Sequence, residues 1–215
     1  MTNKVNKSAP SFQEAINDGK VISIVLAGVG GQGTLIAGKL LGILAQNLDL
    51  DVKVSEVHGM SQRGGAVITY VRMGKKVYSP IVEEGMADYC LCFESLEALR
   101  WANLLKESGT MIISSQQINP LPVLINQAKY PENIEEQLCS RRKNECNILQ
   151  VDALSAAQKS GSARATNMVM LGALSTFMGA SDDLWMKAIK EAFSSKPGTI
   201  PMNLDAFKRG QDLAR

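Results

Sequence analysis

Two short loops hold most of the residues in this chain whose types and spacing suit chemistry. The first places four glycines in six residues, Gly28–Gly33 (GVGGQG), and the second, His58–Gly65, reads HGMSQRGG. Glycine lets a backbone turn sharply and lets a ligand approach the N–H groups closely. His58 is the only histidine and suits proton transfer or hydrogen bonding. Arg63 suits a carboxylate or phosphate held by two hydrogen bonds. The two loops are therefore the candidate site.

Structural explanations for the same residues stay open. His58 could merely pin its loop, and Arg63 could be solvated. A metal site at His58 is not predicted, because no second histidine or suitable cysteine lies nearby. The cysteines stand at positions 90, 92, 139 and 146, a spacing that matches neither a zinc ribbon nor an iron–sulfur motif. Reduced thiols are predicted, and no metal site on this chain.

Hydrophobic periodicity predicts the elements that position the loops. Residues 21–27 form a short apolar run, typical of a strand buried on both faces, and residues 34–45 have the pattern of a helix. That helix begins inside the first loop, so its exposed N–H groups favour an anion such as phosphate or carboxylate. Further strands are predicted at 52–57, 66–73, 77–81 (in a hairpin with 66–73), 88–93, 109–115 and 146–152. Further helices are predicted at 11–16, 94–105, 131–138, 153–159, 167–178, 182–193 and 204–213.

This order of elements predicts an α/β fold: a three-layer Rossmann-like sandwich with a mostly parallel (mixed) sheet and a helical C-terminal part. We predict a polar N-terminal extension over residues 1–20 and a single domain over residues 21–215, since 45% of the chain is apolar and no linker divides it. Asn167 stands where a helix N-cap is expected. Gly172, inside that helix, indicates close packing against another element or another subunit.

Composition excludes several classes of protein. The formal net charge is only +2 and the basic residues are scattered, so neither nucleic acid nor a membrane is a predicted partner. The N-terminal residues lack the apolar region of a secretion signal, and no apolar run is long enough to cross a bilayer. We therefore expect a cytoplasmic protein.

The first loop also satisfies the dinucleotide fingerprint G-x-G-x-x-G between a strand and a helix. Glu56 ends the second predicted strand, where an acid that binds the ribose could lie. The extra glycine at Gly31, the polar Gln32 and the glycine-rich loop directly after Glu56 weaken this interpretation. A free-standing Rossmann-type dehydrogenase that binds NAD or FAD, or a nucleotide-binding module, remains the alternative function.

Four motifs together resemble one known family: the two loops, Asn167–Gly172 and the late Asn203–Phe207. Over roughly residues 20–211 the chain is similar to the gamma-type subunits and domains of the 2-oxoacid:ferredoxin oxidoreductases. Other gamma-type subunits tend to carry Tyr-Gly where this chain has His58-Gly59, which favours the indolepyruvate branch.

The resemblance implies an activity that the chain performs only in a complex. Such enzymes oxidatively decarboxylate a 2-oxoacid, pass electrons to ferredoxin and release an acyl-CoA. A larger partner subunit would hold thiamine diphosphate, Mg and the iron–sulfur clusters, while this chain would hold no cofactor tightly and would complete the site for coenzyme A. The residues predicted to be catalytic are His58, from its residue type and place in the loop, and Arg63. Those implied to line the site, contact coenzyme A or shape the interface are Gly28, Gly30, Gly31, Gln32, Gly33, Ser61, Gln62, Gly64, Gly65 and Asn167.

Overall fold

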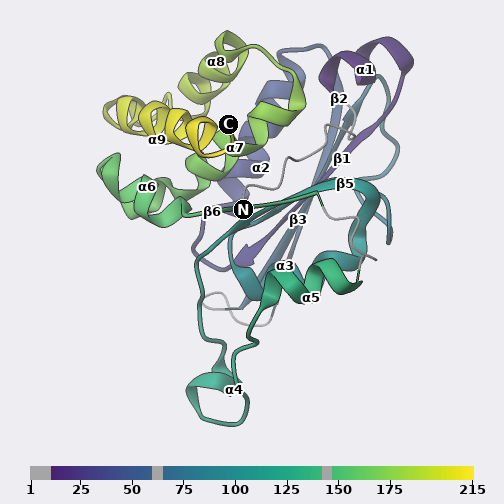
Figure 1. Cartoon of the computed structure of the whole chain (residues 1–215). Helices are drawn as coiled ribbons and strands as arrows, with labels where there is room; N and C mark the ends of the chain where they lie inside the picture. The colour runs from purple at the N-terminus through teal and green to yellow at the C-terminus, as the bar shows by residue number, and fades with distance from the viewer. Residues whose placement is uncertain (1–10, 60–64, 142–146) are drawn as a thin grey trace.

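The computed structural model describes residues 11–59, 65–141 and 147–215. This part of the chain forms a six-stranded sheet in the order β2-β3-β1-β4-β5-β6, with helices on both faces (Figure 1). The strands are β1 (Ile22–Val29), β2 (Asp51–His58), β3 (Ala66–Gly74), β4 (Ala87–Cys92), β5 (Leu105–Ser114) and β6 (Asn147–Val151). Strands β1, β4, β5 and β6 are parallel, and β3 runs antiparallel between β1 and β2. The predicted mixed, mostly parallel sheet is confirmed.

Helices on one face of the sheet outnumber those on the other. One face is covered by α2 (Thr34–Gln46), α6 (Ala153–Lys159), α7 (Thr166–Met178), α8 (Asp182–Ala192) and α9 (Ile200–Leu213). The other face is covered by α3 (Ser95–Trp101) and α5 (Ile134–Arg141). The short elements are α1 (Phe12–Asp18), α4 (Leu121–Leu124) and the 3-10 turns η1 (Ala102–Leu104), η2 (Ala163–Ala165) and η3 (Pro197–Thr199). The predicted three layers and helical C-terminal part are confirmed.

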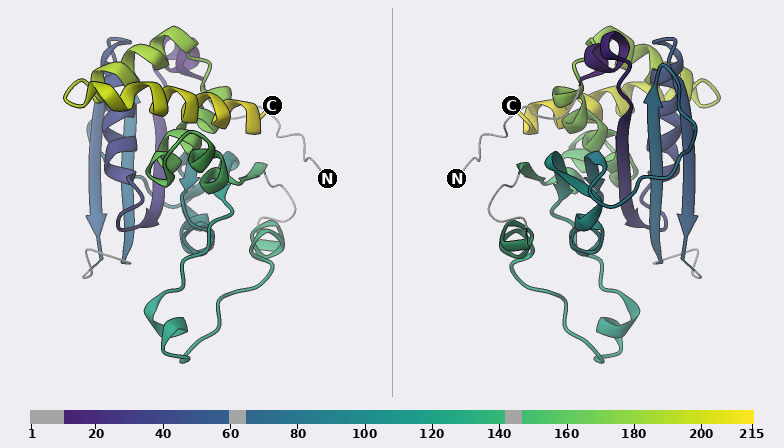
Figure 2. Two further views of the ribbon diagram at one scale, coloured as in Figure 1. Left: turned by 90° about the vertical axis from the view of Figure 1, so that its left-hand side faces the viewer. Right: turned by 90° about the vertical axis from the view of Figure 1, so that its right-hand side faces the viewer.

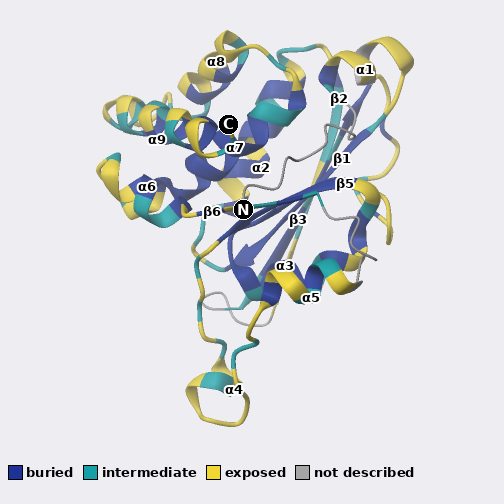
Figure 3. Cartoon of the chain, in the orientation of Figure 1, coloured by how far each residue is buried: buried dark blue, intermediate teal, exposed yellow. Residues whose placement is uncertain are grey.

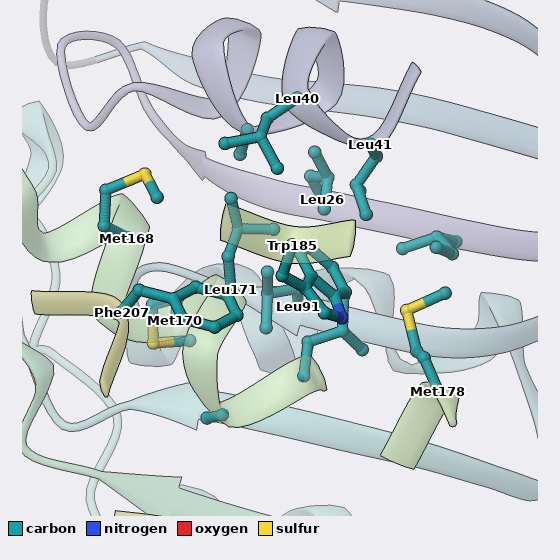
Figure 4. Close-up of a cluster of buried hydrophobic side chains, with 14 of the residues drawn as sticks. Leu26, Leu40, Leu41, Leu91, Met168, Met170, Leu171, Met178, Trp185 and Phe207 are labelled. Atoms are coloured by element: carbon teal, nitrogen blue, oxygen red, sulfur yellow. The ribbon is translucent and has the colours of Figure 1, made fainter. Parts of the chain in front are cut away.

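The central strands are buried on both faces, as their apolar runs indicate. Every residue of β1 and β4 is buried. Alternate side chains of β1 enter two separate cores: Leu26 belongs to the larger core and Val25 to the smaller one, which also contains Cys90 and Cys92. In the larger core the rings of Trp185 and Phe207 lie 5.3 Å apart (Figure 4).

Helices α7 and α9 approach each other at two glycines. A Cβ built on Gly172 would lie 1.9 Å from the carbonyl oxygen of Phe207. Reciprocally, a Cβ built on Gly210 would lie 1.9 Å from the carbonyl oxygen of Val169. Gly172 therefore packs against another element of the same chain, and the late Asn203–Phe207 motif lies in that packing helix.

Several predicted elements differ in the structure. Residues 77–81 do not form a strand, because both edges of β3 are already paired. The carbonyl oxygens of Ser79 and Ile81 accept hydrogen bonds from Nη1 of Arg72 instead (3.0 and 3.3 Å). The short helix α4 was not among the predicted elements; Pro122 is tolerated in its first turn, where no N–H partner is needed. Helix α5 begins at Ile134, after Pro131, and α9 begins at Ile200, before the predicted start at 204.

Candidate functional site

The two glycine loops meet at one edge of the sheet. Strands β1 and β2 point the same way, because each is antiparallel to β3 between them. The loops that follow them therefore leave the sheet at the same edge. The backbone N–H of Gly30 donates a hydrogen bond to the carbonyl oxygen of Gly65 (2.9 Å). This bond joins the first loop to the end of the second.

The side chain of Gln32 lies between the ends of neighbouring parallel strands. Its Oε1 accepts a hydrogen bond from the backbone N–H of Val29 (2.7 Å). Its Nε2 donates to the carbonyl oxygen of Phe93 (2.8 Å) and to Oε1 of Gln116 (3.1 Å). A Cβ on Gly28 would lie 2.9 Å from Gln32 Oε1, so a larger residue at 28 would displace this amide.

That amide lies between the ends of β1 and β4, the position at which nucleotides bind in other doubly wound sheets. Helices α2 and α3 follow β1 and β4 and lie on opposite faces of the sheet. Such a change of face marks the point at which ligands enter Rossmann-type folds. Here Gln32 links the two strand ends directly, and its polar groups are satisfied within the protein.

Asn167 connects the first loop to the C-terminal helices. It is the second residue of α7, and Ala165 is the N-cap, so the predicted capping role is wrong. The side chain is 3% exposed, and its Nδ2 donates to the carbonyl oxygen of Gly33 (3.4 Å). Gly33 has φ of 82° and a Cβ there would lie 2.7 Å from Asn167 Nδ2, so both conformation and space require glycine. Asn167 thus supports the loop instead of starting its own helix.

His58 has a carboxylate partner that sequence reasoning missed. Its Nε2 lies 2.6 Å from Oε1 of Glu56, and the other carboxylate oxygen accepts a hydrogen bond from Oγ1 of Thr69 (3.2 Å). The side chain of Glu56 is 11% exposed and that of His58 is 56% exposed. Residues two apart in a strand face the same side of the sheet, which is the signal that could have found this pair. Glu56 therefore orients the imidazole of His58, and both of its carboxylate oxygens have partners within the protein.

Four predicted site residues, Ser61, Gln62, Arg63 and Gly64, lie outside the described residues. Their roles stay predictions. Of the second loop the structure describes His58, Gly59 and Gly65. The N–H of Gly59 donates to the carbonyl oxygen of Ala66 (3.0 Å), which closes the base of the loop.

A polar hollow of about 610 Å³ is lined by residues from the starts of α3 and α5 and from the segments beside them. It is lined by Ser95, Gln117, Tyr130, Gln150 and residues 131–136. Three glutamates, at 132, 135 and 136, stand around it, so it is unfavourable for an anion. An anionic ligand is better suited to the glycine loops.

Neither a metal cluster nor a membrane-spanning helix is found in the described part of the chain. Among residues 11–59, 65–141 and 147–215, no three His, Cys, Asp or Glu residues gather closely enough to hold a metal ion. Over the same ranges no helix has the length and apolar character needed to cross a bilayer.

Comparison with known proteins gives consistent matches over nearly the whole chain. Residues 23–213 match the family model for pyruvate ferredoxin/flavodoxin oxidoreductase. The indolepyruvate oxidoreductase subunit IorB of Thermococcus kodakarensis is 41% identical over 198 residues, which cover 91% of this chain and 97% of that protein.

Solved structures share the fold at lower identity. The gamma subunit of a keto/oxoacid ferredoxin oxidoreductase from Geobacter sulfurreducens matches with a TM-score of 0.64 at 22% identity, over 90% of this chain and 98% of that one. The 2-oxoglutarate:ferredoxin oxidoreductase of Magnetococcus marinus, solved with 2-oxoglutarate, coenzyme A and succinyl-CoA bound, matches with a TM-score of 0.70 at 22% identity. That match covers 91% of this chain and 31% of the Magnetococcus chain.

Proposed function

Because this chain belongs to the pyruvate ferredoxin/flavodoxin oxidoreductase family, we propose that it is the small subunit of an indolepyruvate-type 2-oxoacid:ferredoxin oxidoreductase. The observation that supports the indolepyruvate branch most strongly is the 41% identity to an indolepyruvate oxidoreductase subunit over almost its full length. The complete enzyme would decarboxylate an aryl 2-oxoacid oxidatively, reduce ferredoxin and form an acyl-CoA. The proposed setting is the cytoplasm.

The larger partner subunit is proposed to hold thiamine diphosphate, Mg and the iron–sulfur clusters. When bound there, these groups would supply decarboxylation and electron transfer. The described residues of this chain do not fit such groups: Cys90 and Cys92 are buried in the smaller core, and no cluster of metal-ligating side chains is present in the described ranges. We derive no chemical step on this chain from them.

The contribution of this chain is proposed to be a surface made by the two loops. The Gly30–Gly65 hydrogen bond holds the two loops beside each other. The first loop is also held by the hydrogen bonds of Gln32 to Phe93 and of Asn167 to Gly33. The first N–H groups of α2 have no partner within the helix, and together with the guanidinium of Arg63 they would favour the phosphates of coenzyme A. The remaining members of the proposed contact surface are Gly31, Gly33, Ser61, Gln62 and Gly64. Gly28 is buried in β1, so its proposed part is to leave room for the amide of Gln32.

His58 is proposed to act beside this surface. Its Nε2 is bound to Glu56, which fixes the ring and leaves more than half of the side chain exposed toward the solvent. An imidazole held in this way keeps Nδ1 free to accept a hydrogen bond or a proton from a group brought by the substrate or by the partner subunit, and to return that proton afterwards.

A free-standing enzyme that binds NAD or FAD is the weaker candidate. The crevice in which its pyrophosphate would lie contains the amide of Gln32, and the acid that would bind the ribose, Glu56, is already bound to His58 and Thr69. Dinucleotide binding would require both sets of contacts to break.

Purification of the tagged chain from its own cells tests the proposal. We expect a larger polypeptide that contains thiamine diphosphate and iron to co-purify. The complex should reduce ferredoxin with indolepyruvate and coenzyme A, whereas the isolated chain should not. Comparing indolepyruvate, phenylpyruvate, pyruvate and 2-oxoglutarate defines the substrate. A chain that associates with no such subunit, or that binds NAD or FAD tightly alone in calorimetry, would overturn the proposal.

A further inference from the structure

One buried row of side chains on β3 contains a single polar member, Thr69. Alternate residues of a strand face the same side of the sheet, so Thr69 shares its face with Val67, Val71 and Met73. All four are buried, and Thr69 is 0% exposed. Valine would fill the same space, and a buried hydroxyl lowers stability unless it is hydrogen-bonded. A hydroxyl in this row therefore indicates a specific partner.

The partner of this hydroxyl is the carboxylate of Glu56. Thr69 lies directly opposite Glu56 in the antiparallel pairing of β3 with β2, so both side chains leave the sheet on the same face. Oγ1 of Thr69 donates a hydrogen bond to Oε2 of Glu56 (3.2 Å), and Oε1 of Glu56 lies 2.6 Å from Nε2 of His58. The carboxylate thus connects a fully buried side chain to a half-exposed imidazole.

This connection crosses from the interior of the sheet to its edge. Figure 2 shows β2 and β3 side by side at that edge, with α2 beside them. In Figure 3 the mostly buried β3 is followed by β2, whose residues are intermediate or exposed. His58, at the end of an edge strand, is therefore oriented by a contact that leads back to a central strand.

Helix α2 fixes the direction in which Thr69 points. A Cβ built on Gly38 of α2 would lie 3.1 Å from Cγ2 of Thr69, and 3.7 Å from side-chain carbons of Leu26 and Val54 on the strands to either side. The methyl group of Thr69 therefore meets α2 where the helix is closest to the sheet. Because threonine is branched at Cβ, fixing the methyl group also fixes the hydroxyl. Since α2 begins in the first glycine loop, its packing on Thr69 links that loop to the residue that opens the second.

We propose that Thr69 is a positioning residue for His58. Its hydroxyl holds the carboxylate of Glu56 in the orientation that binds Nε2 of the imidazole, which leaves Nδ1 available to a group brought by the substrate or by the partner subunit. Without the hydroxyl, the carboxylate could turn about its terminal torsion, which has only a broad preference, and the imidazole would follow. The effect on turnover rests on the proposed function, whereas the effect on the ring rests on these contacts alone.

Two substitutions at position 69 separate the hydroxyl from the rest of the side chain. Thr69→Val keeps the shape and removes the donor, whereas Thr69→Ser keeps the donor and removes the methyl group. Thr110→Val is the matched control, because Thr110 is 1% exposed and lies in β5, which β1 and β4 separate from β3. Circular dichroism checks that each variant is folded.

Nuclear magnetic resonance of the full-length chain measures the state of the ring. His58 is the only histidine, so isotopically labelled histidine reports on one imidazole. When the ring is neutral, the wild type, Thr69→Ser and Thr110→Val should show the nitrogen chemical shifts of the tautomer protonated at Nε2, because the carboxylate accepts that proton. Thr69→Val should move both shifts toward those of free imidazole, a mixture of tautomers. Identical shifts in Thr69→Val and the wild type, or equal displacement in Thr69→Ser, would overturn the proposal.

Turnover of the assembled enzyme measures the consequence for catalysis. Thr69→Val should lower kcat about 10-fold or more and change the KM for coenzyme A less than about 2-fold, because the imidazole is misplaced while the loops stay in position. Thr69→Ser and Thr110→Val should stay within about 3-fold of the wild type, since each keeps the contact to Glu56. In a Glu56→Ala background Thr69→Val should cause no further loss, because the hydroxyl acts through that carboxylate. A further loss there would show that Thr69 acts through packing instead.

The two measurements separate this inference from the proposed function. If the wild-type chain binds no larger subunit or the complex has no oxidoreductase activity, the proposed function fails, and the ring shifts still decide whether Thr69 positions His58. If the wild-type complex is active and Thr69→Val leaves both kcat and the ring shifts unchanged, the function stands and the positioning role is refuted.

Discussion

Replacement of Gly172 by alanine should destabilise the protein strongly, although alanine is the better helix former. The added Cβ would lie 1.9 Å from the carbonyl oxygen of Phe207 and 3.1 Å from the backbone nitrogen of Gln211. The first distance is about 1.5 Å shorter than an ordinary van der Waals contact. Because the neighbouring atoms belong to the backbone of α9, no side chain can rotate away, and the two helices must separate.

The magnitude follows from two opposing effects. Overpacking of a close-packed core costs about 3 kcal/mol at the upper end of its usual range, and separation of α7 from α9 also loosens contacts around Phe207. The gain in helix propensity from glycine to alanine offsets about 1 kcal/mol of this. We expect a net loss of about 2 kcal/mol in the free energy of unfolding, or about 4–8 °C in melting temperature for a chain of this size.

Gly42→Ala is the matched control for this substitution. Gly42 lies inside α2, and a Cβ built there meets no atom within 4 Å. The same change should therefore stabilise the protein by up to about 1 kcal/mol. Gly210→Ala, at the other side of the crossing, should repeat the loss, and the double variant should lose less than the sum, since one Cβ already separates the helices.

Urea and thermal unfolding of the purified variants measure these differences. A Gly172→Ala protein that unfolds at the wild-type midpoint, or a Gly42→Ala protein that is equally destabilised, would refute the reasoning from close helix contact. Circular dichroism before unfolding checks that each variant keeps its helices.

Three further predictions concern the site and the thiols. Gln32→Glu places a carboxylate oxygen against the carbonyl oxygen of Phe93 and Oε1 of Gln116, so it should lower the free energy of unfolding at pH 7 by about 2 kcal/mol. An unchanged urea midpoint would contradict these contacts. In the assembled enzyme, Glu56→Ala should reduce turnover almost as far as His58→Ala, and the double variant should be no slower, because the carboxylate acts through the imidazole; additive losses would show independent roles. Burial raises the pKa of the Cys92 thiol, so iodoacetamide should label the partly exposed Cys139 before Cys92. Peptide mass spectrometry that finds Cys92 labelled as early as Cys139 would argue against its burial.

Local patterns were sufficient to predict most of the elements. The strand β1 is predicted by its run of apolar residues, and the helix α6 by the helical spacing of its apolar residues; both patterns involve only residues close together in the sequence. The helix predicted from residue 11 begins with a capping box, which is equally local: Glu14 Oε2 accepts from the N–H of Ser11 (2.6 Å). The prediction failed at residues 77–81, where the pairing of β3 with two other strands decided the outcome.

The sequence by itself therefore determined the α/β class, the two glycine loops and the resemblance to one family. Tertiary structure alone decided which distant groups these loops meet. Gln32 finds Phe93 and Gln116, and Asn167 finds Gly33, across separations of 61 to 134 residues. Periodicity reports which face of an element is buried, but a polar side chain is satisfied by whichever donor or acceptor the fold brings within about 3 Å. For this reason the sequence predicted a dinucleotide-like loop, and only the fold revealed that the amide of Gln32 joins the ends of β1 and β4 where the dinucleotide would lie.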